Sequence, residues 1–187
     1  MGMKVLWAYF TFVMVVSFAV LGWIGTRIYQ EMPPIPQRVV TTDGQPLIDQ
    51  GQITAGQNVW QSMGGMQVGS IWGHGSYVAP DWTADWLHRE ATFLLDRWSQ
   101  AEHGTSYDGL TSEQQAQLRA RLTDTIRTNT YDRVSGTVTI HPLRAEAFAA
   151  NLAHYSAVFS QGNPAYAIPA GAVTDTQRLR NLAALRR

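Results

Sequence analysis

The stretch VLWAYFTFVMVVSFAVLGWIGT, residues 5–26, decides how this chain is organised. Its 22 residues carry no formal charge, and about 20 such residues are enough to cross the hydrocarbon core of a bilayer. Lys4 and Arg27 bound the stretch, and tryptophan and tyrosine stand near both of its ends, as they do at the two faces of a membrane. We therefore predict a transmembrane anchor helix over residues 1–31, in contact with the lipid bilayer.

A cleaved signal peptide is the rival interpretation of this stretch. The apolar run is longer than the roughly 7–15 residues of a signal peptide, and residues 24–27 offer no A-x-A-like cleavage site. An uncleaved anchor is therefore favoured. A short N-terminal stub before a long domain favours export of that domain, so we expect a single-pass protein of the bacterial inner membrane with its soluble domain in the periplasm.

The composition of the chain excludes several classes of function. Its 187 residues leave roughly 150 after the anchor, which is the usual size of one domain. Lys+Arg and Asp+Glu both number 14, so the net charge is zero and no nucleic-acid partner is indicated. Cysteine is absent, which excludes disulfides, thiolate metal sites, iron–sulfur ligation and covalent haem attachment through C-x-x-C-H.

The pattern after the anchor predicts a mainly α domain with a small β-hairpin. Residues 32–52 are typical of a proline-rich spacer followed by a hairpin around Asp43 and Gly44, the favoured turn pair. Residues 53–187 are expected to form the main domain. Its first helix should begin at a cap on Thr54 and stop at the glycine pair 64–65.

Local signals place the remaining elements. Asp81 can cap a helix that ends near Gly104, and residues 111–114, TSEQ, fit a capping box that opens the next helix. Residues 134–140 predict a short strand or hairpin, and Pro142 can start a further helix. Thr174 is expected to cap the last helix. The helical pattern is still running at the C-terminus, which we interpret as a chain cut short.

The sequence shows no catalytic motif. Its five histidines are scattered without metal-ligand spacing, and the run His88-Arg89-Glu90 is typical of an ion-paired helix face rather than of a catalytic group. A metal-dependent enzyme using His74 and His88 is the weakest of the hypotheses that we consider. Residues 71–82, IWGHGSYVAPDW, stand out because large rings alternate with glycines that permit unusual backbone angles and close approach.

Three stretches carry a resemblance to a known family. They are GQNVWQSMGG at 56–65, VGSIWGHG at 68–75 and APDWTADWLHRE at 79–90, and they closely resemble the N-terminal region of quinol-dependent nitric oxide reductases. The resemblance implies an anchor helix and a periplasmic domain with a cytochrome c-like fold but no haem c. In that family a large helical bundle follows, which holds haem b, haem b3 and non-haem iron and is absent from this chain.

The resemblance also extends to the cytochrome c subunit of the related two-subunit enzyme. When residues 73–80 are aligned with its Gly-x-Gly-x-Tyr-x-Ala-Pro segment, the two haem-attachment cysteines fall on Gly65 and Val68, and the haem-ligating histidine falls on Gly69. All three haem-attachment residues are therefore replaced. Gly75 and Tyr77 match residues that help to bind an interfacial calcium ion in that relative, so the resemblance implies candidate calcium ligands here, beside packing as an equal interpretation of Tyr77.

These inferences lead to two main hypotheses. In the first, the chain is the anchor and periplasmic cap of a nitric oxide reductase that converts two NO to N2O with electrons from a membrane quinol. Its role is structural, its partner is the catalytic bundle in the same or another polypeptide, and the chain alone contains no catalytic residue and no cofactor. In the second, it is an independent membrane-anchored periplasmic binding or sensor domain.

Overall fold

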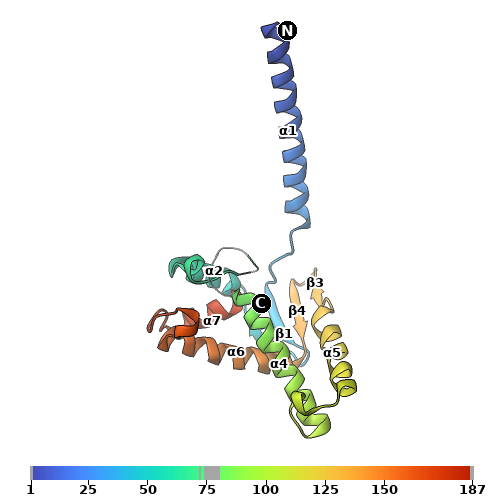
Figure 1. Ribbon diagram of the computed structural model, residues 1–187, viewed down its shortest axis with the longest axis vertical. Coiled ribbons are helices and arrows are strands. Elements are labelled where there is room, and N and C mark those ends of the chain that lie inside the picture. The colour runs from blue at the N-terminus through green and yellow to red at the C-terminus, as the bar shows by residue number, and fades with distance from the viewer. Residues whose placement is uncertain (1, 72, 74–80, 186–187) are drawn as a thin grey trace. The chain divides into compact units, whose positions relative to one another are not determined.

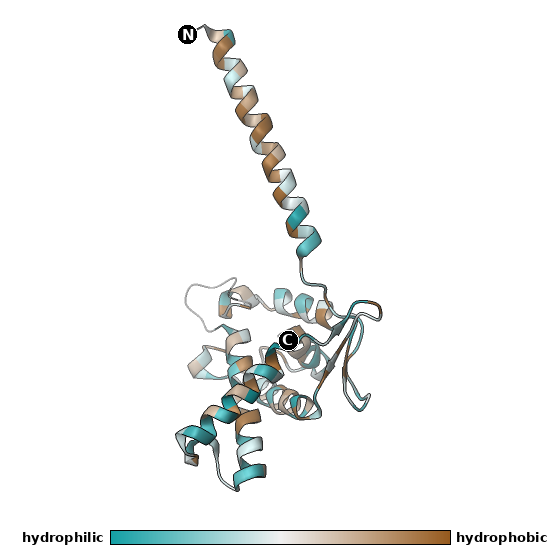
Figure 2. Cartoon of the chain, turned by 90° about the vertical axis from the view of Figure 1, so that its right-hand side faces the viewer, coloured by the Kyte–Doolittle hydropathy of each residue, from teal (hydrophilic) through white to brown (hydrophobic). Residues whose placement is uncertain are grey.

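The computed structural model describes residues 2–71, 73 and 81–185, and these residues fall into two compact units, Met1–Ile35 and Pro36–Arg187. The first unit contains helix α1, Met3–Glu31. None of its residues is buried, and among the described helices it is the one long and apolar enough to cross a membrane. Figure 2 shows apolar residues along most of α1 and hydrophilic ones towards Glu31. A single-pass membrane anchor is compatible with this helix.

The second unit is mostly helical, as the sequence predicted, and a small sheet lies at one side of its helices (Figure 1). Its helices are α2 at Gln52–Ser62, α3 at Gly65–Val68, α4 at Trp82–His103, α5 at Ser112–Arg127, α6 at Pro142–Gln161 and α7 at Thr176–Leu185. Two 3-10 turns, η1 at Tyr107–Gly109 and η2 at Pro164–Tyr166, precede α5 and follow α6.

The sheet is larger than the predicted hairpin. In the described chain it has four strands in the order β2-β1-β4-β3, made by Pro46–Ile48, Arg38–Thr41, Thr137–Ile140 and Tyr131–Asp132. The hairpin at Asp43 and Gly44 is confirmed, because β1 and β2 pair in antiparallel fashion and Gly44 has a φ of 83° in the turn. The sequence did not predict that β1 also pairs in parallel with β4.

Two of the predicted helix starts are wrong, whereas the second predicted hairpin is present. Helix α2 begins at Gln52 after Gly51, so Thr54 lies inside the helix and does not cap it. Helix α7 is capped by Asp175, whose carboxylate accepts a hydrogen bond of 2.7 Å from the backbone N–H of Arg178, and not by Thr174. Of the two structures predicted over 134–140, the hairpin is confirmed: β4 begins at Thr137 and pairs with β3 in antiparallel fashion.

The longest helix of the second unit agrees with its sequence signals at both ends. The Asp81 carboxylate accepts a hydrogen bond from the N–H of Ala84, and Gly104 ends α4 with a left-handed φ of 69°. The capping box of Thr111 and Gln114 at the start of α5 is also present. These caps satisfy backbone groups that a helix end leaves without intrahelical partners, which explains why the signals are reliable.

Aromatic rings fill the main core. Trp82 and Trp86, one helical turn apart on α4, have no exposed surface. The ring of Trp86 stacks on Tyr155 of α6 at a centroid distance of 5.5 Å, and Trp82 packs on Phe159 at 5.6 Å. Trp60 of α2 contacts Trp82 edge to face. Burial of the apolar surface of these rings stabilises the packing of α2, α4 and α6.

Helices α2 and α7 approach each other at Gly56. A Cβ atom at this position would collide with the backbone carbonyl of Asn181 in α7. Only glycine permits so close an approach between two helix backbones. A smaller core, formed by Leu94, Trp98, Leu110 and Leu118, joins α4 to α5.

Candidate functional site

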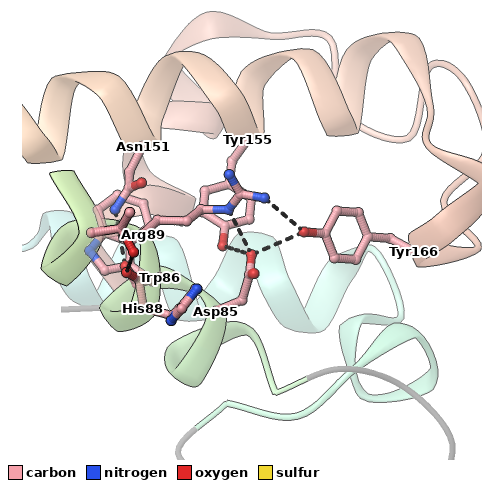
Figure 3. Close-up of polar contacts among 8 residues, drawn as sticks. Asp85, Trp86, His88, Arg89, Asn151, Tyr155 and Tyr166 are labelled. Atoms are coloured by element: carbon pink, nitrogen blue, oxygen red, sulfur yellow. Dashed lines mark hydrogen bonds and ion pairs between the residues drawn. The ribbon is translucent and has the colours of Figure 1, made fainter. Parts of the chain in front are cut away.

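The most elaborate polar cluster of the domain surrounds Asp85 on the first turns of α4 (Figure 3). Its carboxylate accepts hydrogen bonds from the hydroxyl of Tyr155 on α6, from the hydroxyl of Tyr166 in η2 at 3.2 Å, and from Nε of Arg89 at 3.1 Å. Nη2 of Arg89 also donates to the Tyr166 hydroxyl at 3.1 Å. The cluster thus ties the start of α4 to two segments that follow it by 70 and 81 residues.

The surroundings of Asp85 keep it ionised. Partial burial by itself raises the pKa of this carboxyl, but the hydrogen bonds from Tyr155 and Arg89, and the charge of Arg89, outweigh burial and lower the pKa below its ordinary value of 3.8. A carboxyl group that has already lost its proton at neutral pH is a poor proton donor. The three hydrogen bonds to its Oδ2 atom link α4 to α6 and η2, which is a structural role.

A second polar link lies one turn further along α4. Glu90 is 2% exposed and accepts a hydrogen bond of 2.7 Å from Nε of Arg144 on α6. At Trp86, which lies between Asp85 and Glu90 along α4, the backbone carbonyl accepts a hydrogen bond of 3.2 Å from Nδ2 of Asn151. The run His88-Arg89-Glu90 is therefore ion-paired, as the sequence indicated, although Glu90 is buried rather than on an open face.

A groove of about 390 Å³ runs along α4 and α6 beside this cluster. Its walls combine carboxylates, imidazoles, a guanidinium and apolar surface, contributed by Asp85, His88, Arg89, Thr92, Phe93, Asp96, Ala150, Asn151 and His154. Within the part of the chain that the structure describes, no group of three or more His, Asp or Glu side chains could hold a metal ion. His88 lies in this groove without such a group, and His74 is outside the described residues.

The residues implied as calcium ligands cannot be placed. Gly75 and Tyr77 both lie outside the described residues, in the segment 74–80. The two ends of that segment are tied together by Asp81, whose carboxylate accepts hydrogen bonds from Oγ of Ser70 at 2.8 Å and from the N–H of Gly73. Burial raises the pKa of Asp81, but hydrogen bonds from Ala84, Ser70 and Gly73 lower it on balance, so its carboxylate is charged.

The three positions aligned with haem attachment lie on and just after α3. Gly65 is buried against the indole of Trp60, and a Cβ atom at this position would overlap the ring. Val68 packs half-buried against the main core, and Gly69 follows it in extended backbone with a φ of 163°. The sequence identified these positions only through the resemblance, because glycine and valine carry no chemical signal of their own.

Residues missed by sequence reasoning make up most of the polar cluster. The spacing of Asp85 and Arg89, four residues apart on a helix, is a signal for their ion pair and could have been found. Nothing in the sequence indicates Tyr155 or Tyr166 as partners of that pair.

The second unit of the chain corresponds to a known domain. A family model that describes the NorB cytochrome c-like domain of nitric oxide reductase matches residues 36–186. This range begins where the second compact unit begins. No curated protein matches the chain.

Proposed function

Because the chain belongs to the family of the NorB cytochrome c-like domain of nitric oxide reductase, we propose that it is the membrane anchor and periplasmic cap of a quinol-dependent nitric oxide reductase. The catalytic bundle that reduces two NO to N2O would lie outside these 187 residues. The observation that carries the proposal is the family match over the whole second unit. The Trp60 ring, which fills the space that a side chain at Gly65 would need, supports it.

The residues present do not fit a haem c. Thioether attachment needs cysteine, and the chain contains none. At the first aligned position, a cysteine side chain would collide with the Trp60 ring that Gly65 accommodates. Trp60 in turn contacts Trp82, which has no exposed surface. The domain would therefore transfer no electrons itself, and electrons would reach the bundle from a membrane quinol.

The role that remains is to dock on the bundle. The Asp85 cluster and the Glu90–Arg144 pair fix the first half of α4 onto α6, which supports a rigid pair of helices that begins at Asp81. We propose that this pair of helices faces the catalytic bundle, in the same polypeptide or a separate one. Gly75 and Tyr77 are proposed, from the resemblance alone, to contribute to a calcium site completed by the bundle.

The anchor and its orientation belong to the same proposal. Helix α1 would cross the bacterial inner membrane once, with the second unit in the periplasm. Its charged end, where Arg27 and Glu31 form an ion pair of 2.6 Å, suits the headgroup layer rather than the hydrocarbon core.

Purification of nitric oxide reductase activity from membranes of the source organism tests this function. We expect peptides of this chain to co-purify with the activity, with haem b and with non-haem iron, and we expect hydroquinone to support turnover. A peroxidase stain for covalent haem should be negative on the polypeptide that contains this chain.

Two outcomes would contradict the proposal. Turnover that depends on reduced cytochrome c, with covalent haem on this chain, would disprove the electron route. Recovery of the chain in fractions that contain neither NO reduction nor haem b would instead support the independent binding or sensor domain.

A further inference from the structure

One apolar side chain of the second unit is presented almost entirely to solvent. Val134, in the turn between β3 and β4, is 96% exposed, more than any other large apolar side chain among the described residues. Exposure of a single valine is ordinary on protein surfaces. Three further observations indicate that this valine is part of a contact surface. They concern the rigidity, the charge and the chain position of the turn.

The turn of residues 133–136 is held in one conformation. The Asp132 carboxylate accepts hydrogen bonds from the backbone N–H groups of Val134 at 3.0 Å and Ser135 at 3.2 Å, and from Oγ of Ser135 at 2.6 Å. Gly136 closes the turn with a left-handed φ of 65°. Val134 is therefore displayed by a fixed scaffold and does not sit on a loose loop.

Positive charge flanks the valine. Arg133 lies beside it in the turn, and Arg38 begins β1 opposite Thr137, the residue after the turn. Both arginines are exposed, and neither has an ion-pair partner among the described residues. The carboxylate of Asp132 accepts hydrogen bonds inside the turn, which lower its pKa, so it stays charged and leaves a net positive charge of one on these three residues. Basic side chains near a membrane are attracted to anionic lipid, and an exposed apolar side chain gains free energy when it is buried among the headgroups.

The turn is hydrogen-bonded to a residue that follows the anchor closely along the chain. The N–H of Gln37 donates a hydrogen bond of 2.8 Å to the carbonyl of Gly136. Five residues, MPPIP at 32–36, connect Glu31 at the end of α1 to Gln37, so an extended chain spans at most about 22 Å. All five are apolar, and Met32 and Ile35 are each 58% exposed, which favours a segment that lies along a membrane surface.

We propose that the β3–β4 turn contacts the lipid bilayer, with Val134 inserted at the level of the headgroups and Arg133 and Arg38 on anionic lipid phosphates. The occupant is a lipid surface because the turn combines an exposed apolar side chain with two exposed arginines, which complement anionic headgroups, and because a connector of only five residues joins its neighbour Gln37 to α1. This inference rests on α1 being embedded in a membrane and is independent of the reaction.

The absence of cysteine from the sequence permits a direct test. The 187-residue chain carrying Val134→Cys is labelled with an environment-sensitive fluorophore and reconstituted in vesicles of phosphatidylcholine and phosphatidylglycerol, with or without acyl-chain bromination. The matched control is Glu113→Cys, an exposed position in the first turn of α5, about 20 Å along that helix from its end at Arg127.

We expect the label at position 134 to shift its emission to shorter wavelength in vesicles and to be quenched by brominated lipid, and the label at 113 to show neither effect. The double variant Arg133→Gln, Arg38→Gln should weaken the quenching at 134 in anionic vesicles. Equal quenching at both positions would overturn the proposal. So would protection of position 134 that arises only when the catalytic proteins are reconstituted with the chain, because that result assigns the turn to a protein surface.

Discussion

The contact between Gly65 and Trp60 gives the sharpest prediction for the stability of the domain. Gly65→Ala adds one methyl group at a position where the Cβ atom would overlap the indole ring of Trp60, which is itself only 4% exposed. The ring or the backbone of α3 must therefore move. Overpacking of this kind costs typically 1–3 kcal/mol, and so deep an overlap belongs near the upper value.

The gain in helix propensity offsets part of this cost. Replacing glycine by alanine inside a helix stabilises it by about 1 kcal/mol, and because Gly65 is the first residue of the short helix α3 the offset is at most that, so the net loss should be at least about 2 kcal/mol. For a domain of this size, that loss corresponds to a decrease in Tm of about 4–8 °C. Thermal unfolding of the detergent-solubilised chain, followed by circular dichroism at 222 nm, is a suitable assay.

Two controls make this prediction specific. Met66→Ala, at the next position of α3, changes a side chain that is 56% exposed and should alter the free energy of unfolding by less than about 0.5 kcal/mol. In a Trp60→Phe background, Gly65→Ala should cost less than in the wild type, because the smaller ring leaves space for the methyl group. If Gly65→Ala is as stable as the wild type, or if its cost is unchanged by Trp60→Phe, the reasoning about this contact is wrong.

Four other changes test the rest of the structure. Arg144→Leu leaves the buried Glu90 carboxylate without its cation and should cost about 3 kcal/mol in urea unfolding, whereas an effect below about 1 kcal/mol would show that the pair is solvated. Asp85→Asn should make the free energy of unfolding less dependent on pH in the acid range, which unfolding at a series of pH values measures. Folding lowers the pKa of Asp85, so its contribution to stability is complete above the ordinary value of 3.8 and is lost as pH falls through the lower folded value. Thr111→Ala removes the capping box of α5 and should cost about 1 kcal/mol by the same assay. Leu94→Ala empties a fully buried site in the smaller core and should cost about 3 kcal/mol, detectable also as loss of protection in hydrogen exchange across α5.

Sequence reasoning succeeded where the determining interactions are local. Asp81 and Gly104 bound α4 because a cap and a left-handed glycine act on the residues immediately beside them. The same reasoning failed at α7, where Thr174 and Asp175 are both good caps and only the geometry of the chain distinguishes them. At α2 the prediction failed because the helix begins after Gly51 without a side-chain cap, so the cap residue Thr54 did not mark its start.

Interactions between distant residues were not predictable. The pairing of β1 with β4 joins Val39 to Val138, and neither strand carries a signal for a partner so far along the chain. The cluster around Asp85 depends on Tyr155 and Tyr166 in the same way. The family resemblance supplied what local patterns could not, since it identified the cytochrome c-like domain that the family model matches over 36–186.

The close approach of α2 and α7 at Gly56 has a consequence for biosynthesis. The aromatic core receives residues from α2 and α4 early in translation, but Leu179, Leu182 and Ala183 of α7 complete it only when almost the whole domain has left the ribosome. Until α7 has been synthesised, the part of this core that it supplies stays open. Open apolar surface favours aggregation, so the delay between the synthesis of α2 and that of α7 is the period in which this domain is most prone to misfold.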